Sequence, residues 1–506
     1  MRSKKAIKNI IFSLLLQFST IICGFITPIL IISKYGSEVN GLISSITQFL
    51  AYIVLLESGF GPVLKAALYK PIAKESEKEI EGLLKNGQQF FRKISVIFIL
   101  YIIILIIFYP IVVNSQFDFA FTVSLIIIIS ISTFFEYFFG ITYRLYLSAA
   151  QETYIISIIQ LITLILNTIL IVFLVKFNFS IITVKIVSTL MYTLRPILQY
   201  LYVTKIKRIK IKNNSESILI PNKWDGLSQH IASTIHSNTD VVVLTLFCRD
   251  MALVSIYSVY YLVINGIKQL IKSFSNSIDS SFGDMIARNE FDNLKEKFNI
   301  YETVYFLIIS VIYICTFILI VPFISVYTKG ISDANYIQYA FGGLLVMSEY
   351  VWAIRQPYNE LIKAAGHFKQ TRRGSWVEAL LNIVLSILLV YKVGLVGIAI
   401  GTLVAMIYRT TEFIYYTNKH ILNRSVLSSL KKIFLILLEV LVALIIFKKI
   451  PLCSNYIEWL KIAVIFFTCA TFIILILNVV FYKDDLKKME AILKRKGIND
   501  EKKCSR

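Results

Sequence analysis

Runs of about 20 apolar residues recur from one end of this 506-residue chain to the other, and an α-helix needs this length to cross a bilayer. Only 16% of the residues are charged, and the mean hydropathy is +0.72. Within lipid the backbone has to satisfy its own hydrogen bonds, so these runs are predicted to be helices. The chain is therefore predicted to be an all-α polytopic membrane protein.

Fourteen apolar segments are predicted to span the membrane, and the basic residues orient them. The segments are 10–32, 42–64, 94–113, 120–142, 155–175, 181–202, 227–247, 254–274, 302–326, 336–362, 376–391, 395–416, 428–447 and 459–482. On this count the outer loops hold only seven of the 52 lysines and arginines: Lys34, Lys176, Arg249, Lys329, Lys392, Lys448 and Lys449. Because cytoplasmic loops carry the excess of basic residues, both termini are predicted to be cytoplasmic.

The net charge of +21 is explained by these cytoplasmic loops and by a basic C-terminal tail, which we expect to contact anionic membrane lipids rather than nucleic acid. The six cysteines form no CxxC pair, so neither a disulfide framework nor a metal site is expected. The sequence also contains no phosphate-binding GxxxxGK[ST], no HExxH and no GxSxG motif. We therefore expect transport rather than catalysis, with no cofactor and no catalytic residue.

Short motifs recur after 214 or 215 residues, which indicates an internal repeat. The matching pairs are Ser19–Ile21 with Ser233–Ile235, Ile72–Lys74 with Ile286–Arg288, Ser148–Gln151 with Lys363–Gly366, Asn167 with Asn382, and Arg195 with Arg409. Matches of Ile and Ala arise by chance in this composition, whereas matches of Asn and Arg within apolar segments do not. Repeats of this kind are typical of transporters.

The repeat predicts two pseudo-symmetric, parallel six-helix lobes. Their boundaries are 1–210 and 227–424, with a cytoplasmic linker at 211–226, two additional transmembrane helices in 425–482 and the basic tail at 483–506. Gly397 and Gly401 form a GxxxG motif in the twelfth segment, which favours close packing of two helices.

Polar residues form a stripe on the first segment of each lobe. The first stripe comprises Asn9, Ser13, Gln17, Thr20, Gly24 and Thr27, and the second comprises His230, Ser233, Ser237 and Asp240, with His236 beside it. Such a stripe faces protein or water rather than lipid. Hydrogen bonding between helices and the lining of a central cavity both explain it, and its occurrence in both lobes favours the cavity.

Basic residues also lie within the apolar segments. They are Lys185, Arg195, Lys268, Arg355 and Arg409, with Arg144 at the inner end of the fourth segment. Each of them can snorkel to the membrane surface. Lys185 lies near the outer surface, where we expect it to snorkel. The recurrence of Arg195, Lys268, Arg355 and Arg409 on alternate segments favours a shared cationic lumen instead, which would attract an anionic head group.

Glu57 lies just before Gly59, Gly61 and Pro62 in the second predicted segment, and we expect these three residues to bend the helix. Its carboxylate could pair with a lumen arginine until substrate displaces it, or it could be a polar helix end at the interface.

Two stretches carry a family resemblance. "YGSEVNGLISSITQFLAYIVLLESGFGPVLKAALYKPIA" and "RQPYNELIKAAGHFKQTRRGSWVEALLNIVLSILLVYKVGLVGIAIGTLVAMIYRT" resemble bacterial polysaccharide transporters of the O-antigen flippase type. These belong to the multidrug/oligosaccharidyl-lipid/polysaccharide (MOP) exporter superfamily. The resemblance extends from Lys4 to about Arg424, and it does not specify a glycan.

The resemblance implies a MOP flippase fold and alternating access in the bacterial plasma membrane. The implied substrate is a sugar or oligosaccharide linked through pyrophosphate to undecaprenol, carried from the inner to the outer leaflet for surface polysaccharide synthesis. The residues expected to meet the pyrophosphate are Arg195, Arg355 and Arg409, with Arg144 and Lys268 behind them, and those expected to meet sugar hydroxyls are Gln17 and Asn9. The candidates for coupling to H⁺ or Na⁺, or for gating, are Glu57, Asp240 and His236.

Two alternatives remain open at this point. One is an ion-coupled multidrug exporter of the same superfamily, and the other is a membrane enzyme or a scaffold for polysaccharide-synthesis enzymes.

Overall fold

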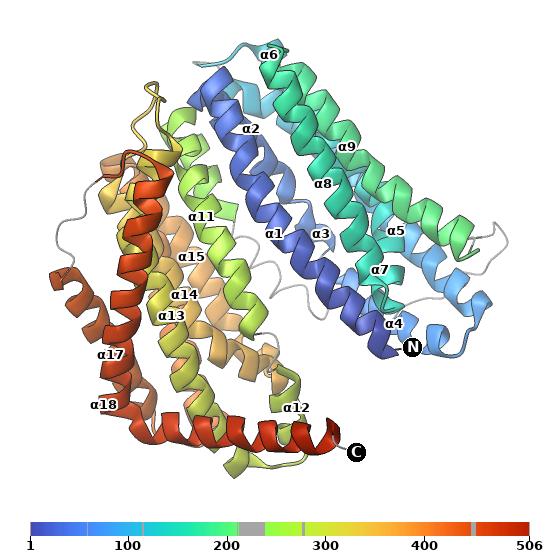
Figure 1. The fold of residues 1–506 in the computed structure, drawn as a ribbon. Coiled ribbons are helices and arrows are strands. Elements are labelled where there is room, and N and C mark those ends of the chain that lie inside the picture. Colours follow the sequence, from blue (N-terminus) through green and yellow to red (C-terminus); the bar gives the residue numbers. More distant parts are fainter. Residues whose placement is uncertain are drawn as a thin grey trace. The chain divides into compact units, whose positions relative to one another are not determined.

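The computed structural model describes residues 2–57, 59–113, 116–209, 211, 238–275, 279–446 and 452–504, and these residues form helices joined by turns (Figure 1). No strand occurs among them. Eleven helices in the described ranges are long and apolar enough to cross a membrane. The prediction of an all-α, multi-pass membrane protein is therefore confirmed, whereas the number of fourteen spans stays a prediction.

The first repeat forms a series of helices with two short π-helical segments. The elements are α1 (Arg2–Tyr35), α2 (Ser37–Ala51), α3 (Val54–Glu57), α4 (Phe60–Ala73), α5 (Glu77–Val113), α6 (Phe119–Phe135), η1 (Glu136–Gly140), α7 (Ile141–Ala149), α8 (Thr153–Lys176), α9 (Ile181–Leu201) and η2 (Tyr202–Ile206). The second predicted span, 42–64, is thus not one helix but is divided among α2, α3 and α4. Pro62 is the third residue of α4, where a proline costs no backbone hydrogen bond.

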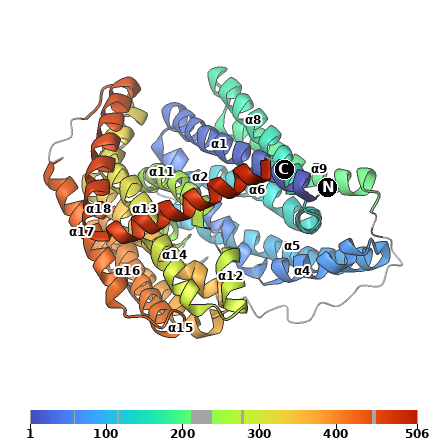
Figure 2. The same cartoon turned by 60° about the horizontal axis from the view of Figure 1, so that its bottom comes forward.

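The second repeat is described from Asn238 onward, so most of its first predicted span lies outside the described residues. The elements are a helix at Asn238–Cys248 that ends in η3 (Leu244–Cys248), then α11 (Met251–Ser275), α12 (Asp279–Ala287), α13 (Phe291–Tyr327), α14 (Tyr339–Ala364), α15 (Phe368–Val393), α16 (Leu395–His420), α17 (Leu427–Ile446) and α18 (Tyr456–Cys504). At Tyr482 the backbone of α18 leaves the helical region, with φ −131° and ψ 36°, and the helix then turns to a new direction (Figures 1 and 2).

Left-handed residues that end helices recur after 214 to 216 residues, which agrees with the interval of the sequence repeat to within one residue. The pairs are Glu75 (φ 54°) with Asn289 (φ 58°), Gln151 (φ 58°) with Gly366 (φ 69°), Asn178 (φ 59°) with Gly394 (φ 55°), and Arg208 (φ 58°) with Asn423 (φ 46°). A left-handed residue just after a helix lets the last carbonyl groups find hydrogen-bond donors. The same helix ends therefore occur at the same places in both halves, which confirms the pseudo-symmetric architecture.

Close contacts divide the chain into two compact units. The first comprises Met1–Leu262 and Gly330–Ala334, and the second comprises Val263–Lys329 and Asn335–Arg506. The predicted boundaries at 210 and 227 follow the repeat rather than the packing, and they stay a prediction. The predicted linker, 211–226, lies outside the described residues apart from Ile211.

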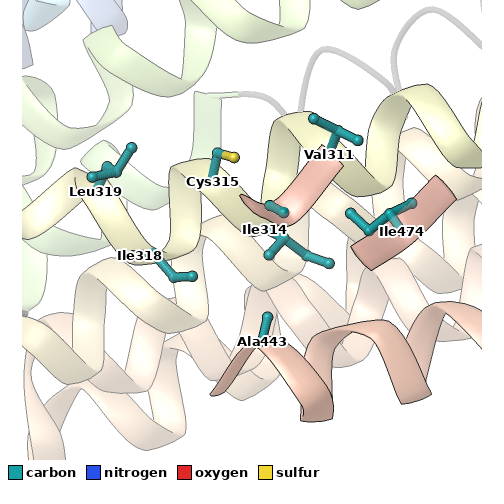
Figure 3. Packing of buried hydrophobic residues seen from close by; sticks show 8 residues of the cluster. Val311, Ile314, Cys315, Ile318, Leu319, Ala443 and Ile474 are labelled. Atoms are coloured by element: carbon teal, nitrogen blue, oxygen red, sulfur yellow. The ribbon is translucent and has the colours of Figure 1, made fainter. Parts of the chain in front are cut away.

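Each unit has its own apolar core. In the first unit, buried residues of α1, α2, α8 and α9 pack together, among them Ile31, Ile43, Ile171 and Val184. In the second unit α13 is the central helix, and its residues pack against α17 and α18 (Figure 3). This cluster comprises Val311, Ile314, Cys315, Ile318, Leu319, Ala443, Ala470 and Ile474.

The GxxxG motif brings α15 and α16 into close contact, as predicted. A Cβ atom on Gly397 would lie 2.5 Å from the backbone carbonyl of Leu389, and one on Gly401 would lie 2.8 Å from the backbone nitrogen of Ser386. Backbone atoms cannot yield as a flexible side chain can. The glycines are therefore required for the distance between these two helices.

We expect Gly397→Ala to lower the free energy of unfolding by about 1–3 kcal/mol, the usual cost of overpacking. The measurement is thermal unfolding of the purified protein in detergent. Gly283→Ala is the matched control, because a Cβ atom there meets nothing within 4 Å. Equal midpoints for both variants would show that α15 and α16 tolerate a wider separation.

Candidate functional site

In the first unit, Glu57, Glu136, Tyr137, Arg144 and Arg195 gather into a polar cluster, which we call the first-unit cluster. Arg144 Nη1 donates to Glu136 Oε1 at 2.6 Å, whereas its Nη2 lies 3.8 Å from Glu57 Oε1. The hydroxyl of Tyr137 donates to Glu57 Oε2 at 2.9 Å. Glu57 is therefore held mainly by Tyr137, and its ion pair with Arg144 is the looser one.

The π-helix η1 explains how Glu136 and Arg144 meet. In a regular α-helix, residues eight apart differ in direction by roughly 80°, because each residue advances the helix by about 100°. The one extra residue of a π-turn reduces this difference to roughly 20°, which puts both side chains on one face. Gly140, in the same segment, leaves room for α9, since a Cβ atom there would lie 2.5 Å from Pro196 Cβ.

Arg195 lies on α9 and is half-buried, with neutral partners. Its Nε donates to Thr163 Oγ1 at 2.8 Å, and its guanidinium lies 4.3 Å from the ring centre of Tyr192. The hydroxyl of Tyr192 in turn accepts a hydrogen bond from Asn167 at 3.1 Å. Among the described residues, no carboxylate forms an ion pair with Arg195.

In the second unit, Arg355 and Arg409 share the carboxylate of Glu378. Arg355 Nη1 donates to Glu378 Oε1 at 2.7 Å, and Arg409 Nε lies 3.5 Å from Glu378 Oε2. Arg409 also donates to Glu412 at 2.6 Å, to Ser375 Oγ at 2.5 Å and to the carbonyl of Thr371 at 2.9 Å. Its side chain is only 3% exposed. The guanidinium of Arg409 is thus fully used within the protein.

Lys268 makes a separate ion pair in the same unit. Its Nζ lies 2.8 Å from Glu349 Oε2 and 4.8 Å from the ring centre of Trp352. Four of the five predicted substrate-contacting cations therefore have carboxylate partners, and Arg195 differs from them.

The repeat shows where this difference arises. Arg195 corresponds to Arg409, and Thr163, 215 residues before Glu378, corresponds to that glutamate. The first repeat thus places a neutral hydroxyl where the second places a carboxylate. The asparagines of the repeat, by contrast, both donate to a hydroxyl of the following helix, Asn167 to Tyr192 and Asn382 to Thr402 at 3.0 Å, although these two hydroxyls are not at equivalent positions of the repeat.

The polar stripe of α1 partly serves to pack that helix against α8. Asn9 Nδ2 donates to the carbonyl of Gln151 at 3.0 Å, and its Oδ1 accepts from the backbone N–H of Tyr154 at 2.8 Å. Ser13 and Ser157 are 3.5 Å apart. These contacts are the interhelical hydrogen bonds that the sequence left open as an alternative. A role of Asn9 or Gln17 in binding sugar stays a prediction.

Of the second stripe, His230, Ser233, His236 and Ser237 lie outside the described residues. Asp240 is described and buried, and it accepts a hydrogen bond from the hydroxyl of Tyr257 at 2.9 Å. A role of Asp240 in ion coupling stays a prediction.

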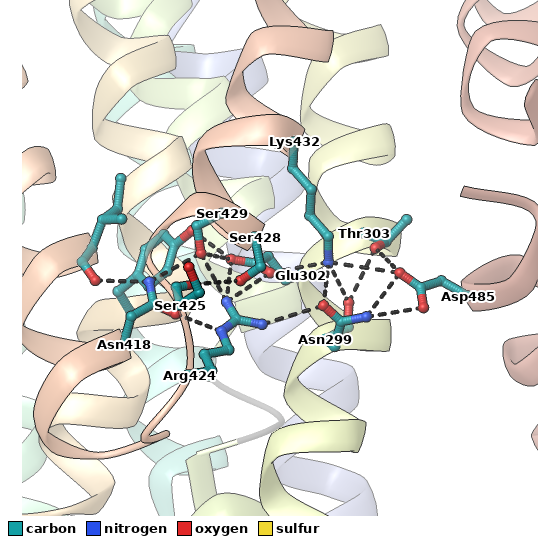
Figure 4. Close-up of polar contacts among 12 residues, drawn as sticks. Asn299, Glu302, Thr303, Asn418, Arg424, Ser425, Ser428, Ser429, Lys432 and Asp485 are labelled. Atoms are coloured by element: carbon teal, nitrogen blue, oxygen red, sulfur yellow. Dashed lines mark hydrogen bonds and ion pairs between the residues drawn. The ribbon is translucent and has the colours of Figure 1, made fainter. Parts of the chain in front are cut away.

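Sequence reasoning missed a larger buried network that joins α13, the start of α17, the turned part of α18 and the loop after α16 (Figure 4). Glu302, fully buried, pairs with Arg424 at 2.9 Å and with Lys432 at 3.0 Å. Asp485 accepts from Asn299 at 2.9 Å and lies 3.8 Å from Lys432. These residues stand at predicted segment ends, where charges are ordinarily solvated. The available signal was Lys432, which lies more than one turn inside the predicted segment 428–447.

Glu152 ties the start of α1 to the turn between α7 and α8. Its Oε1 lies 2.8 Å from Lys5 Nζ and 2.6 Å from Lys207 Nζ. Burial by itself would raise the pKa of Glu152, but the hydrogen bonds and charges of Lys207 and Lys5 outweigh it and hold the pKa below the ordinary value of 4.5. The folded state therefore binds this proton more weakly than the unfolded state does.

We expect Glu152 to stabilise the fold above pH 4.5, its ordinary pKa, and to lose this contribution as the pH falls through that value toward the lower folded pKa. The unfolding midpoints of the protein and of Glu152→Gln should thus differ at neutral pH and converge in acid. A constant difference across this range would contradict the assignment.

Comparisons with known proteins place the fold. No family model matches the sequence, and no curated protein matches it either. Among solved structures, the lipid II flippase MurJ in an inward closed conformation superposes with a TM-score of 0.68 at 17% identity, over 94% of this chain and 99% of that one. An inward-facing multidrug-resistance MATE transporter of the MOP superfamily gives a TM-score of 0.65 at 13% identity, over 80% and 94%.

A eukaryotic MATE transporter gives a TM-score of 0.56 at 13% identity, over 86% of this chain and 99% of that one. At these identities the likeness concerns the fold. It agrees with the architecture that the sequence predicted, namely two similar six-helix halves followed by further helices. The chain thus has the fold of the transporters of the MOP superfamily.

Proposed function

We propose that this protein carries an undecaprenyl-pyrophosphate-linked sugar or oligosaccharide from the inner to the outer leaflet of the bacterial plasma membrane. In this proposal the two six-helix lobes alternate access around a lumen, both termini face the cytoplasm, and the exported glycan is used for surface polysaccharide synthesis. The fold supports the general class, because structures with this fold include a lipid II flippase and MATE transporters. Polysaccharide-synthesis enzymes are the proposed protein partners.

The observation that carries the proposal is Arg195, an arginine within a predicted span whose described partners are a hydroxyl and an aromatic ring. A cation in this position is costly unless a function requires it. Phosphate oxygens match the geometry of a guanidinium and accept two parallel hydrogen bonds from it. A pyrophosphate could bind Arg195 without breaking an ion pair, and it could compete with Glu57 for Arg144.

The cations of the second unit enter the proposal differently. Arg355, Arg409 and Lys268 are already paired with Glu378, Glu412 or Glu349. A substrate phosphate would have to exchange with one of these carboxylates. We therefore propose Arg195 and Arg144 as the first contacts of the pyrophosphate, and the second-unit cations as contacts that form only after such an exchange.

The membrane potential can supply part of the driving force. Each negative charge that leaves an inside-negative cell gains roughly 2.3 kcal/mol per 100 mV. Export of a pyrophosphate is driven in this way if the empty protein returns without that charge. Coupling to H⁺ or Na⁺, with Glu57 or Asp240 as carrier, is a further proposal.

The alternative of an ion-coupled multidrug exporter has one specific observation in its favour. Asp240 is a buried carboxylate in a predicted span with a hydroxyl partner, and intramembrane carboxylates commonly mark ion pathways. Such an exporter of cations would use Asp240 and Glu57 as its principal charges. It would not need Arg195.

The test is a flux assay with the purified protein in vesicles. The cargo is a fluorescently labelled undecaprenyl-pyrophosphate-linked sugar, measured first without potential or ion gradient and then with each imposed separately. We expect transbilayer movement that a potential of the appropriate sign accelerates. Movement of a cationic dye instead would support the multidrug exporter, and movement of neither cargo would support the enzyme or scaffold.

A further inference from the structure

Glu439 lies near the middle of α17, in the additional pair of helices that follows the two repeats, and it is not part of the proposed substrate site. Its side chain is 2% exposed. Around it lies the apolar cluster that α13, α17 and α18 form, which includes Ala443 one turn further along and Ile474 on α18 (Figure 3). A carboxyl group in such a place requires an explanation, because an unpaired charge is costly in an apolar interior.

The two oxygens of this carboxyl group differ. Oε1 accepts a hydrogen bond of 2.6 Å from Nδ2 of Asn478, whose amide also donates to the carbonyl of Ile474. Oε2 is buried and has no hydrogen-bond partner among the described residues. No described lysine, arginine or histidine forms an ion pair with either oxygen. One oxygen is thus held as an acceptor by Asn478, and Ser310 of α13 is the other polar side chain that faces this carboxyl group.

A small cavity lies beside Glu439. Its lining comprises Thr303, Phe306, Ser310, Lys432, Leu435, Ile436, Glu439, Asn478 and Tyr482. The space open to the centre of a water molecule is about 10 Å³, which is close to what one buried water requires. The cavity extends from Glu439 toward Lys432, which lies two helical turns away on the same face of α17.

The titratable groups around the site do not supply a counter-charge. Lys432 is neutralised by Glu302 at 3.0 Å and by Asp485. Tyr350 of α14 bonds to the hydroxyl of Ser310 at 2.7 Å. Tyr482 of α18 lines the far wall of the cavity.

We propose that Glu439 is a proton-binding site. The proton resides on Oε2 and points into the cavity toward a single water, while Oε1 remains the acceptor for Asn478. The neutral acid satisfies both oxygens and removes the buried charge. Proton exchange proceeds through the cavity, toward the end of α17 that carries Lys432.

Infrared difference spectroscopy of the full-length protein in phosphatidylcholine vesicles tests this directly. At neutral pH we expect the carbonyl band of a protonated carboxylic acid, which shifts in D₂O and disappears in Glu439→Gln. Asn478→Leu should keep the band and move it to higher frequency, because the carbonyl loses its donor. Glu458→Gln is the matched control: this partly exposed carboxylate at the start of α18 accepts a hydrogen bond from Ser454, and its removal should leave the band unchanged.

Thermal unfolding gives a second measurement. Glutamine reproduces the neutral acid, so Glu439→Gln should unfold at the same temperature as the parent protein at neutral pH. In alkali the parent should lose stability as the carboxyl ionises, and the variant should not share this loss. A band that persists in Glu439→Gln would overturn the proposal, as would a parent protein that lacks the band and is stabilised by Na⁺. Neither result bears on the flux of lipid-linked sugar.

Discussion

Replacing Glu302 with glutamine should lower the free energy of unfolding by about 3–5 kcal/mol, the usual cost of removing one partner from a buried ion pair. Glu302 is fully buried, and it is the carboxylate on which Arg424 and Lys432 converge. Both cations are themselves at most 5% exposed. Without the charge of Glu302, Arg424 would have no ion pair among the described residues, and the one ion pair left to Lys432 there would be the longer one with Asp485.

Thermal unfolding in detergent, followed by tryptophan fluorescence, measures this change. The matched control is Glu296→Gln, on the same helix, because Glu296 pairs with Lys488 at 2.9 Å while both side chains are more than half exposed. Exposed pairs contribute about 0–1 kcal/mol. A loss of stability no larger than that of the control would mean that Arg424 and Lys432 find other counter-charges.

The second large effect concerns transport. We expect Arg195→Gln to slow the flux of pyrophosphate-linked sugar roughly 100-fold, which corresponds to the loss of about 3 kcal/mol from a desolvated charge contact. The fold should remain intact, since Arg195 contributes to it one hydrogen bond, to Thr163, and one ring contact. Initial rates in vesicles, at matched amounts of inserted protein, measure the effect.

Two further variants separate charge from packing. Thr163→Val removes the hydrogen bond and keeps the cation, so it should retain most of the flux. Arg409→Gln changes the repeat-related arginine, whose four polar partners lie within the protein, and it should reduce stability more than Arg195→Gln does. If Arg195→Gln transports normally, the pyrophosphate does not depend on this arginine and the proposed site is wrong.

The positions of the helices could be predicted because lipid imposes them. An apolar run in a bilayer has to satisfy its backbone internally, so hydropathy alone determines most segments. The repeat was visible because the arginines and asparagines within these segments are rare enough to mark equivalent places. Close packing at Gly397 was predictable because glycines four residues apart form a helix face on which the backbone of a second helix can approach closely.

The break inside the second segment could not be predicted from hydropathy, which continues through it. After Ala51 the backbone hydrogen bonds span three residues instead of the four of an α-helix. Their donors are the N–H groups of Tyr52, Ile53, Leu55 and Leu56. This tighter turn ends α2 and separates it from α3, whose last residue, Glu57, accepts a hydrogen bond from Tyr137. The glycines and Pro62, which predicted a bend, lie after this point and mark only the start of α4.

The partners of the charges were also beyond the sequence. Which carboxylate meets Arg144 depends on the extra residue in η1, and a π-turn has no reliable sequence signal. The network around Glu302 depends on the approach of Arg424 and Lys432, which both lie more than 100 residues after Glu302 in the sequence. In the sequence, a charged residue at the end of an apolar segment looks the same whether its side chain faces water or another charge.

The turn of α18 at Tyr482 brings the end of the chain back to α13. Asp485, just after the turn, bonds to Asn299 and Thr303 of α13, while Lys432 of α17 reaches the same asparagine. The last two helices are therefore anchored to α13 by polar groups of that helix. A chain shortened to the two repeats would expose the buried carboxylate of Glu302 and the apolar flank of α13 together, so these two helices are part of the folded core of the second unit.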